Sequence, residues 1–127
     1  MRIGLVLLLG TFLLLSACDR ELSITEVQPE KIGQQVLESI QPASSENVQM
    51  LFNPKRGRYI VVHAFGLVTM SVEDQGTVVG VFIQDHTDDE NEILKRYVFK
   101  LDYDRDYDSI QLYRNNLEIP FDNSSSY

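Results

Sequence analysis

From Asn47 onward, apolar and polar residues alternate with a period of two, and turn-forming residues interrupt the pattern at short intervals. Between Val68 and Glu73, for example, every second residue is Val or Met and the residues between them are polar. A period of two places alternate side chains on the two faces of a strand, and turn signals roughly every 8 to 12 residues are typical of antiparallel sheets. The pattern therefore predicts antiparallel β-structure after Asn47.

Two stretches define strands more closely. The run from Tyr59 to Phe65 is almost unbroken in its apolar character, as expected for a central strand that is covered on both faces. Asn115-Asn116 separates two short apolar segments, and asparagine tolerates positive φ, so this pair predicts a tight hairpin turn. Pro120 cannot donate to a sheet ladder, which places the last strand of the hairpin at an edge or at its end.

One helix is expected before the strands. Pro29 suits the first position of a helix, and Ile32, Val36 and Ile40 recur at a spacing of four residues to give one apolar stripe. Pro42 ends the pattern, because the residue before a proline is pushed out of the helical region. The predicted fold class is therefore α+β and mainly β: one N-terminal helix packed on an antiparallel sheet of six or seven strands, forming a small sandwich or barrel.

The start of the chain has the layout of an export signal. A short basic start, Met1-Arg2, precedes an apolar run from Ile3 to Ala17 that ends in small residues. This run is shorter than the about 20 apolar residues that a membrane-spanning helix needs. Cys18 follows directly and is the only cysteine, so it has no partner for an internal disulfide. Leu15-Ser16-Ala17-Cys18 resembles the lipobox of bacterial lipoproteins.

That resemblance implies cleavage before Cys18, a diacylglyceryl group on the Cys18 sulfur and often a further acyl chain on the new amino terminus. The mature protein is then expected at the cell membrane, lipid-anchored and facing the outside or the periplasm. Asp19 resembles the inner-membrane retention signal of lipoproteins in double-membraned bacteria, and it carries no such meaning in a single-membrane bacterium. The alternative is an uncleaved anchor with an incidental cysteine.

The expected domain organisation has four parts. Residues 1–17 are a lipoprotein signal peptide, and residues 18–28 are a tether that is polar and without periodicity. Residues 29–121 are a single β-rich domain, and residues 122–127 are a disordered tail with nothing to bury. A domain of this size without a disulfide must be held together by apolar burial.

Net charge restricts the partners. Residues 1–17 contain one charged residue, Arg2, so their removal changes the net charge from −8 to −9. A chain this acidic is repelled by phosphate backbones and by anionic lipid headgroups. Nucleic acid is therefore not an expected partner, and the acyl chains must provide the attachment to the membrane.

Two acidic segments are candidate metal sites. Four aspartates alternate through residues 102–108, and their oxygens would suit a hard cation such as calcium if the segment formed a compact loop. An acidic, solvated surface connection is the alternative, and the residues that a helix-loop-helix calcium loop needs are missing. His86 stands among carboxylates in residues 85–92, and a metal site there would need His63, which is more often a structural residue in such a strand. We therefore expect no metal and no cofactor.

No catalytic constellation is found, and an enzyme is not expected: the chain has no nucleophile elbow and no glycine-rich phosphate loop. The overall plan, with residues 107–121 closing a β-rich domain, resembles small lipoproteins of Gram-positive bacteria of unknown function. Some such sequences bear a peptidyl-prolyl isomerase label, but no residue here matches the pocket of a known isomerase family. The predicted function is a non-enzymatic binding or structural module of the cell envelope, with an envelope protein or peptide as partner. The alternatives are a calcium-responsive module using residues 102–108 and an isomerase-type enzyme.

Overall fold

The computed structural model describes residues 21–86 and 93–127. The predicted signal peptide, Cys18 and most of the acidic segment 85–92 lie outside these ranges. In the described part of the chain, no helix is long and apolar enough to cross a membrane.

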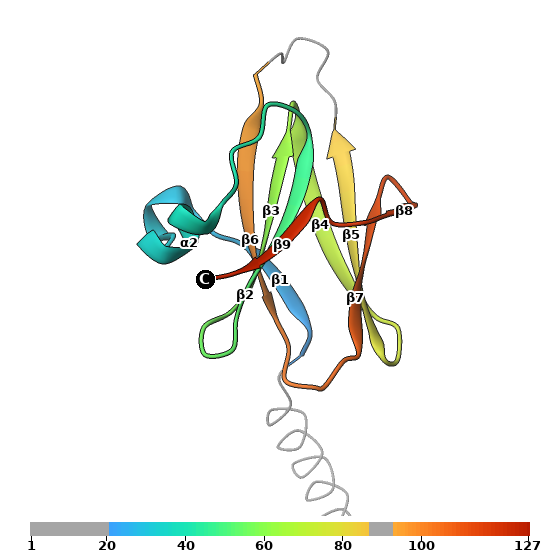
Figure 1. Ribbon diagram of the computed structural model, residues 1–127. Coiled ribbons are helices and arrows are strands. Elements are labelled where there is room, and N and C mark those ends of the chain that lie inside the picture. Colours follow the sequence, from blue (N-terminus) through green and yellow to red (C-terminus); the bar gives the residue numbers. More distant parts are fainter. Residues whose placement is uncertain (1–20, 87–92) are drawn as a thin grey trace, which may run out of the picture.

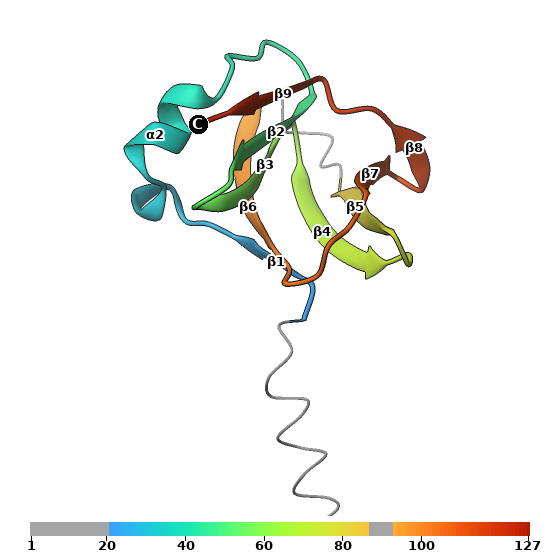
Figure 2. The same ribbon diagram turned by 60° about the horizontal axis from the view of Figure 1, so that its bottom comes forward.

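Two β-sheets make up most of the described chain (Figure 1). The five-stranded sheet has the order β1 (Ser23–Glu26), β6 (Lys95–Asp102), β3 (Gly57–Ala64), β2 (Asn47–Asn53) and β9 (Asn123–Ser126). The four-stranded sheet has the order β4 (Leu67–Asp74), β5 (Val78–His86), β7 (Ser109–Arg114) and β8 (Leu117–Ile119). Figure 2 shows the two sheets enclosing a common interior. The mainly β prediction is thus confirmed.

The main core lies between the two sheets. Alternate residues of the longer strands point into it, as the period-two pattern predicts. The larger buried side chains there are Val48, Met50, Ile60, Val62, Val68, Val79, Val81, Ile83, Phe99, Leu101 and Leu112. Strand β3 is the middle strand of its sheet, and Ile60, Val61, Val62 and Ala64 have no exposed surface. This confirms the prediction of a central strand covered on both faces.

The predicted single helix is wrong in its extent. Residues Pro29–Lys31 form the short 3-10 helix η1, and the α-helix α2 is limited to Gln34–Ser39. Gly33 between them has extended backbone dihedrals, φ −64° and ψ 148°, so the helical hydrogen bonds do not run through it. Val36 and Ile40 nevertheless pack on Leu51 and other residues of the outer face of the five-stranded sheet, where they form a second, smaller core.

Strand number and direction also differ from the prediction. The described residues form nine strands, whereas six or seven were predicted for the sheet, and two of the described pairings are parallel: β2 with β9, and β5 with β7. Both exceptions have the same cause, because the connections before β7 and β9 cross from one sheet to the other. A strand that enters a sheet after such a crossing is not bound to run opposite to its neighbour.

The predicted tether and tail contribute the two additional edge strands. In the tether, Ser23–Glu26 pairs with β6 as β1, and Ile24 packs against the main core. In the predicted disordered tail, Asn123–Ser126 pairs with β2 as β9. The sequence Asn-Ser-Ser-Ser has no apolar periodicity, and β9 is held by its ladder and by its flanks: the ring of Tyr127 lies edge-on to Tyr59 at 5.7 Å between centroids. The folded domain therefore includes most of residues 21–28 and extends through residue 127.

The predicted hairpin is confirmed. Asn115 and Asn116 have φ of 52° and 68°, the left-handed values that a tight primed turn needs, and they join β7 to β8. Strand β8 lies at the edge of the four-stranded sheet and ends just before Pro120, as the missing N–H of proline predicts.

Candidate functional site

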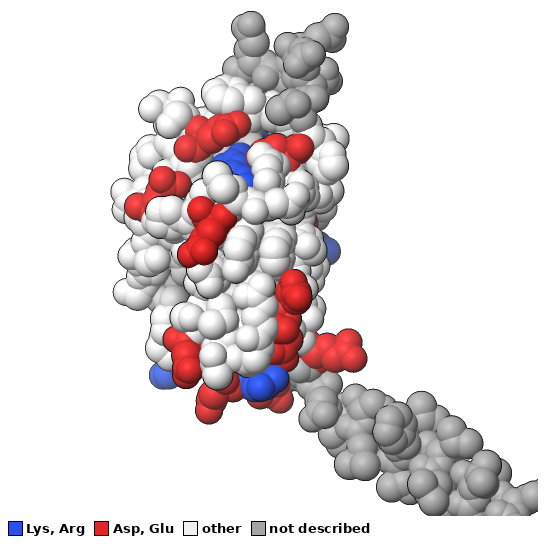
Figure 3. All heavy atoms as spheres, turned by 90° about the vertical axis from the view of Figure 1, so that its right-hand side faces the viewer, with Lys and Arg blue, Asp and Glu red and all other residues white. Residues whose placement is uncertain are grey.

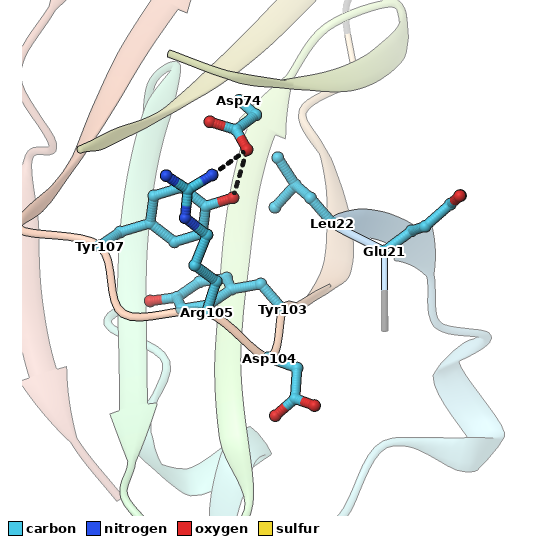
Figure 4. Close-up of a pocket in the computed structure, with 7 residues that line it drawn as sticks. All are labelled: Glu21, Leu22, Asp74, Tyr103, Asp104, Arg105 and Tyr107. Carbon is cyan, nitrogen blue, oxygen red and sulfur yellow. Dashed lines mark hydrogen bonds and ion pairs between the residues drawn. The ribbon is translucent and has the colours of Figure 1, made fainter. Parts of the chain in front are cut away.

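A hollow lies at the end of the sandwich where the described chain begins, at the bottom in Figure 1. Three segments meet there: the start of the chain at Glu21 and Leu22, the end of β4 at Asp74, and the connection between β6 and β7. We call this hollow the Asp74 pocket, and its volume is about 520 Å³. Its lining residues are Glu21, Leu22, Asp74, Tyr103, Asp104, Arg105 and Tyr107 (Figure 4).

Asp74 is the centre of a hydrogen-bonded network in this pocket. Arg105 Nη1 donates to Asp74 Oδ2 at 2.8 Å, and the Tyr107 hydroxyl donates to the same oxygen at 3.1 Å (Figure 4). The backbone N–H of Gly76, in the turn after β4, donates to Asp74 Oδ1 at 2.9 Å. The Gly76 N–H, followed by Tyr107 and Arg105, lowers the pKa of Asp74, so its carboxylate stays ionised.

Two tyrosines form the apolar wall of the pocket. The rings of Tyr103 and Tyr107 meet edge to face, with centroids 5.0 Å apart and planes at 86°. The quadrupoles of the two rings favour this edge-to-face arrangement. Partial burial is the first cause that raises the pKa of both phenols, so both remain neutral near pH 7.

The tyrosines and the aspartates of residues 102–108 differ in their exposure to solvent. Tyr103 and Tyr107 are half-buried, whereas the four aspartates between and beside them are exposed. In residues 21–86 and 93–127, no three His, Cys, Asp or Glu side chains gather as ligands for a metal ion. The aspartates thus lie on the solvent-exposed side of this connection.

The two histidines lie on different sheets and do not meet. His86, at the end of β5, is exposed, and its Nε2 lies 3.0 Å from Thr69 Oγ1. His63, in β3, is buried, and Arg96 Nε donates to its Nε2 at 3.3 Å. Burial, with a smaller effect of the Arg96 charge, lowers the pKa of His63. The carboxylates of residues 87–92 lie outside the described residues.

His63 is therefore expected to make the fold sensitive to mild acid. Its pKa is 6.5 in an unfolded chain and lower in the folded one, so the unfolded state binds the proton more readily. The contribution of neutral His63 is complete above about pH 6.5 and is lost as the pH falls below that value. Urea unfolding at about pH 7.5 and about pH 5.5 should show this loss in the wild type, and His63→Gln should show a smaller one. An equal loss in both proteins would contradict this role of His63.

Acidic side chains dominate the surface around the site. Figure 3 shows acidic residues spread over the face of the four-stranded sheet, with a cluster of both signs at the end where the described chain begins. Among the described ion pairs, the one at this end joins Arg105 to Asp74, and Glu21 and Asp104 take part in none. Glu21 and Asp104 therefore place unpaired negative charge at the rim of the Asp74 pocket, beside its apolar surface.

Sequence reasoning missed Leu22 and Asp74 as lining residues of this pocket, and it missed Arg58, which lines a neighbouring hollow together with Tyr103 and Tyr107. Leu22 and Asp74 were assigned to a tether and to a turn, and nothing local shows that these segments meet. Arg58 did carry a signal: it has the same parity as Ile60 and Val62 in β3, so the period-two pattern places it on the inner face of the sheet.

Comparison with known proteins adds no further constraint, because no family model, no curated protein and no solved structure matches this chain.

Proposed function

We propose that this chain is an exported lipoprotein, anchored to the cell membrane through lipid on Cys18, whose β-sandwich binds a partner in the cell envelope without catalysing a reaction. The lipobox-like sequence Leu15-Ser16-Ala17-Cys18 supports the anchor. The position of the Asp74 pocket is the observation that carries the binding function.

The Asp74 pocket is close in sequence to the proposed anchor. Leu22 lines the pocket and follows Cys18 by four residues. Four residues of fully extended chain reach about 14 Å, so the pocket lies within about that distance of Cys18. A partner in this pocket would therefore be held next to the membrane. Attachment to the membrane and binding of the partner would be parts of one task.

The chemistry of the pocket favours a basic peptide segment with an apolar side chain. Glu21 and Asp104 supply negative charge, while the charge of Asp74 is already paired with Arg105. Tyr103, Tyr107 and Leu22 supply the apolar contact surface. The net charge of −9 after removal of residues 1–17 would further attract a basic partner over long range.

The ionisation of the pocket supports binding over catalysis. A general acid or base works best when its pKa lies near the working pH. In the Asp74 pocket the two phenols have raised pKa values and Asp74 has a lowered one, so all three shifts lead away from neutral pH. These groups are suited to hold fixed charge and fixed hydrogen bonds.

The proposal is tested by titrating the purified, detergent-solubilised protein with a short synthetic peptide that alternates lysine and phenylalanine. A matched peptide with acetylated lysines removes the charge alone. Binding is expected to weaken by about tenfold for the acetylated peptide, and by about threefold for Glu21→Gln or Asp104→Asn. Glu118→Gln, at the exposed edge strand β8, is the control and should bind as the wild type does. Equal affinity for both peptides, or no binding, would reject a basic partner.

A further inference from the structure

A second hollow of about 300 Å³ opens beside the Tyr103–Tyr107 pair, and it does not include Asp74, Glu21 or Leu22. Its walls come from both sheets: Met50, Arg58 and Ser124 from the five-stranded sheet, and Ser109 and Ile110 from the four-stranded one, with Phe121 between β8 and β9. We call it the Arg58 pocket. Its composition differs from that of the Asp74 pocket, because the charged side chain that points in from the inner face of the sheet is an arginine and not an aspartate.

Arg58 is held between two aromatic rings. Its guanidinium carbon lies 4.5 Å from the centroid of Phe52 and 4.7 Å from the centroid of Tyr103. Because Arg58 points into the sandwich from β3, its side chain is half-buried. The two rings stabilise the positive charge and fix the position of the guanidinium.

The N–H groups of this guanidinium have no protein acceptor among the described residues. The Arg58 side chain takes part in no described hydrogen bond or ion pair, in contrast to those of Arg105 and Arg114, which both bind carboxylates. A guanidinium has five N–H donors, and no side-chain nitrogen of Arg58 is among the described buried polar atoms without a partner, so these donors are open to a ligand in the pocket. Two parallel N–H groups of arginine match the two oxygens of a carboxylate.

We propose that the Arg58 pocket binds a carboxylate that is joined to an aromatic or aliphatic group. Arg58 receives the carboxylate in a bidentate arrangement, and the hydroxyls of Ser109 and Ser124 are among the further hydrogen-bonding groups of the pocket. Met50, Ile110 and Phe121 provide apolar surface for the rest of the ligand. A volume of about 300 Å³ admits a group of the size of a phenyl ring.

Asp108 sets the charge that this pocket accepts. It lines the pocket with an exposed side chain, and its negative charge opposes any anion. A single charge on the ligand is balanced by Arg58, whereas a phosphate dianion would meet Asp108 with excess negative charge. The pocket is thus expected to prefer a carboxylate over inorganic phosphate, and Asp108→Asn is expected to strengthen carboxylate binding.

The test is a titration of the full-length protein in detergent with benzoate, using the neutral isostere benzamide as the control ligand. Binding is followed by nuclear magnetic resonance of the arginine side-chain N–H groups and by calorimetry. Benzoate is expected to bind at least tenfold more tightly than benzamide and than inorganic phosphate. N-acetylphenylalanine is titrated in parallel, because it represents the carboxyl terminus of a peptide, whereas benzoate represents a free small molecule. Tighter binding of N-acetylphenylalanine identifies a peptide carboxyl terminus as the ligand, and tighter binding of benzoate identifies a free small molecule.

Variants of the two charged residues complete the test. Arg58→Gln is expected to weaken benzoate binding at least tenfold. Arg58→Lys is expected to weaken it by a smaller factor, because lysine keeps the charge but loses the bidentate geometry. Asp108→Asn is expected to strengthen benzoate binding about twofold. The proposal is overturned if benzoate and benzamide bind equally, or if Asp108→Asn and Arg58→Lys leave benzoate binding unchanged. Neither result bears on the basic-peptide titration, which depends on Glu21 and Asp104.

Discussion

Replacing Arg114 by leucine is expected to lower the free energy of unfolding by about 3–5 kcal/mol, the usual result of leaving one member of a buried ion pair without its partner. Arg114 Nε and Nη2 each donate to a different oxygen of Asp85 at 2.8 Å. The two side chains are only 12% and 13% exposed. The hydrogen bonds from Arg114 are the first cause of a lowered pKa of Asp85.

The cost arises because Asp85 would remain charged with little access to water. Asn115 Nδ2 also donates to Asp85 at 2.9 Å, but an amide does not neutralise a carboxylate. The pKa of Asp85 lies below its ordinary value of 3.8 in the folded protein, so the contribution of this pair is present above about pH 4 and is lost as the pH falls through the folded value. Arg114→Leu should therefore remove part of the acid sensitivity of the fold as well.

The structure offers a matched control for this variant. Arg105 also forms an ion pair with an aspartate at 2.8 Å, but there the side chains are 59% and 43% exposed. Arg105→Leu is expected to have a much smaller effect on the free energy of unfolding, because water screens an exposed pair. Urea unfolding of both variants gives the comparison, and joint replacement of Asp85 and Arg114 by leucine should recover part of the loss. Equal costs for Arg114→Leu and Arg105→Leu would show that burial does not matter here.

The second large effect is expected at Cys18. With Cys18→Ala, the chain should lose all incorporation of radiolabelled fatty acid and should move from the membrane fraction to the soluble one. The physical reason is that acyl chains are the proposed attachment, and an acidic domain has no electrostatic attraction to anionic lipids. Ser16→Ala keeps a small residue in the lipobox-like sequence and should be labelled as the wild type is. Labelling of Cys18→Ala at the wild-type level would reject the lipoprotein assignment.

The strands that line the core could be predicted from the sequence. Burial requires apolar side chains on the face that points into the core, and this requirement produces the observed period of two. The unbroken run in β3 and the pair Asn115-Asn116 each carry a local signal with one physical meaning. Strand β9 carries no such signal, since Asn, Ser, Ser and Ser are typical of loops. Its structure comes from the free edge of β2 and from Tyr127, whose hydroxyl donates to the Gly57 carbonyl at 3.0 Å.

The candidate sites were less accessible to sequence reasoning, because they depend on contacts between distant segments. Asp74 and Arg105 are more than thirty positions apart, and their pairing follows from the crossing of the chain between the sheets. The alternating aspartates of residues 102–108 suggest a cation site in the sequence. In the structure, Tyr103, Arg105 and Tyr107, which alternate with them, line the Asp74 pocket. Arg58 could have been recognised as an inward-pointing charge, but its aromatic neighbour Tyr103 comes from another strand connection.

The most direct test of the central proposal, that the sandwich holds an envelope partner next to its lipid anchor, is site-specific photo-cross-linking in the cells that make the protein. A photoreactive residue replaces Asp104, which lines the Asp74 pocket, and in a matched strain it replaces Glu118 on β8. The proposal predicts a discrete cross-linked partner in the membrane fraction from position 104 and none from position 118. No adduct from position 104, or the same adducts from both positions, would contradict it.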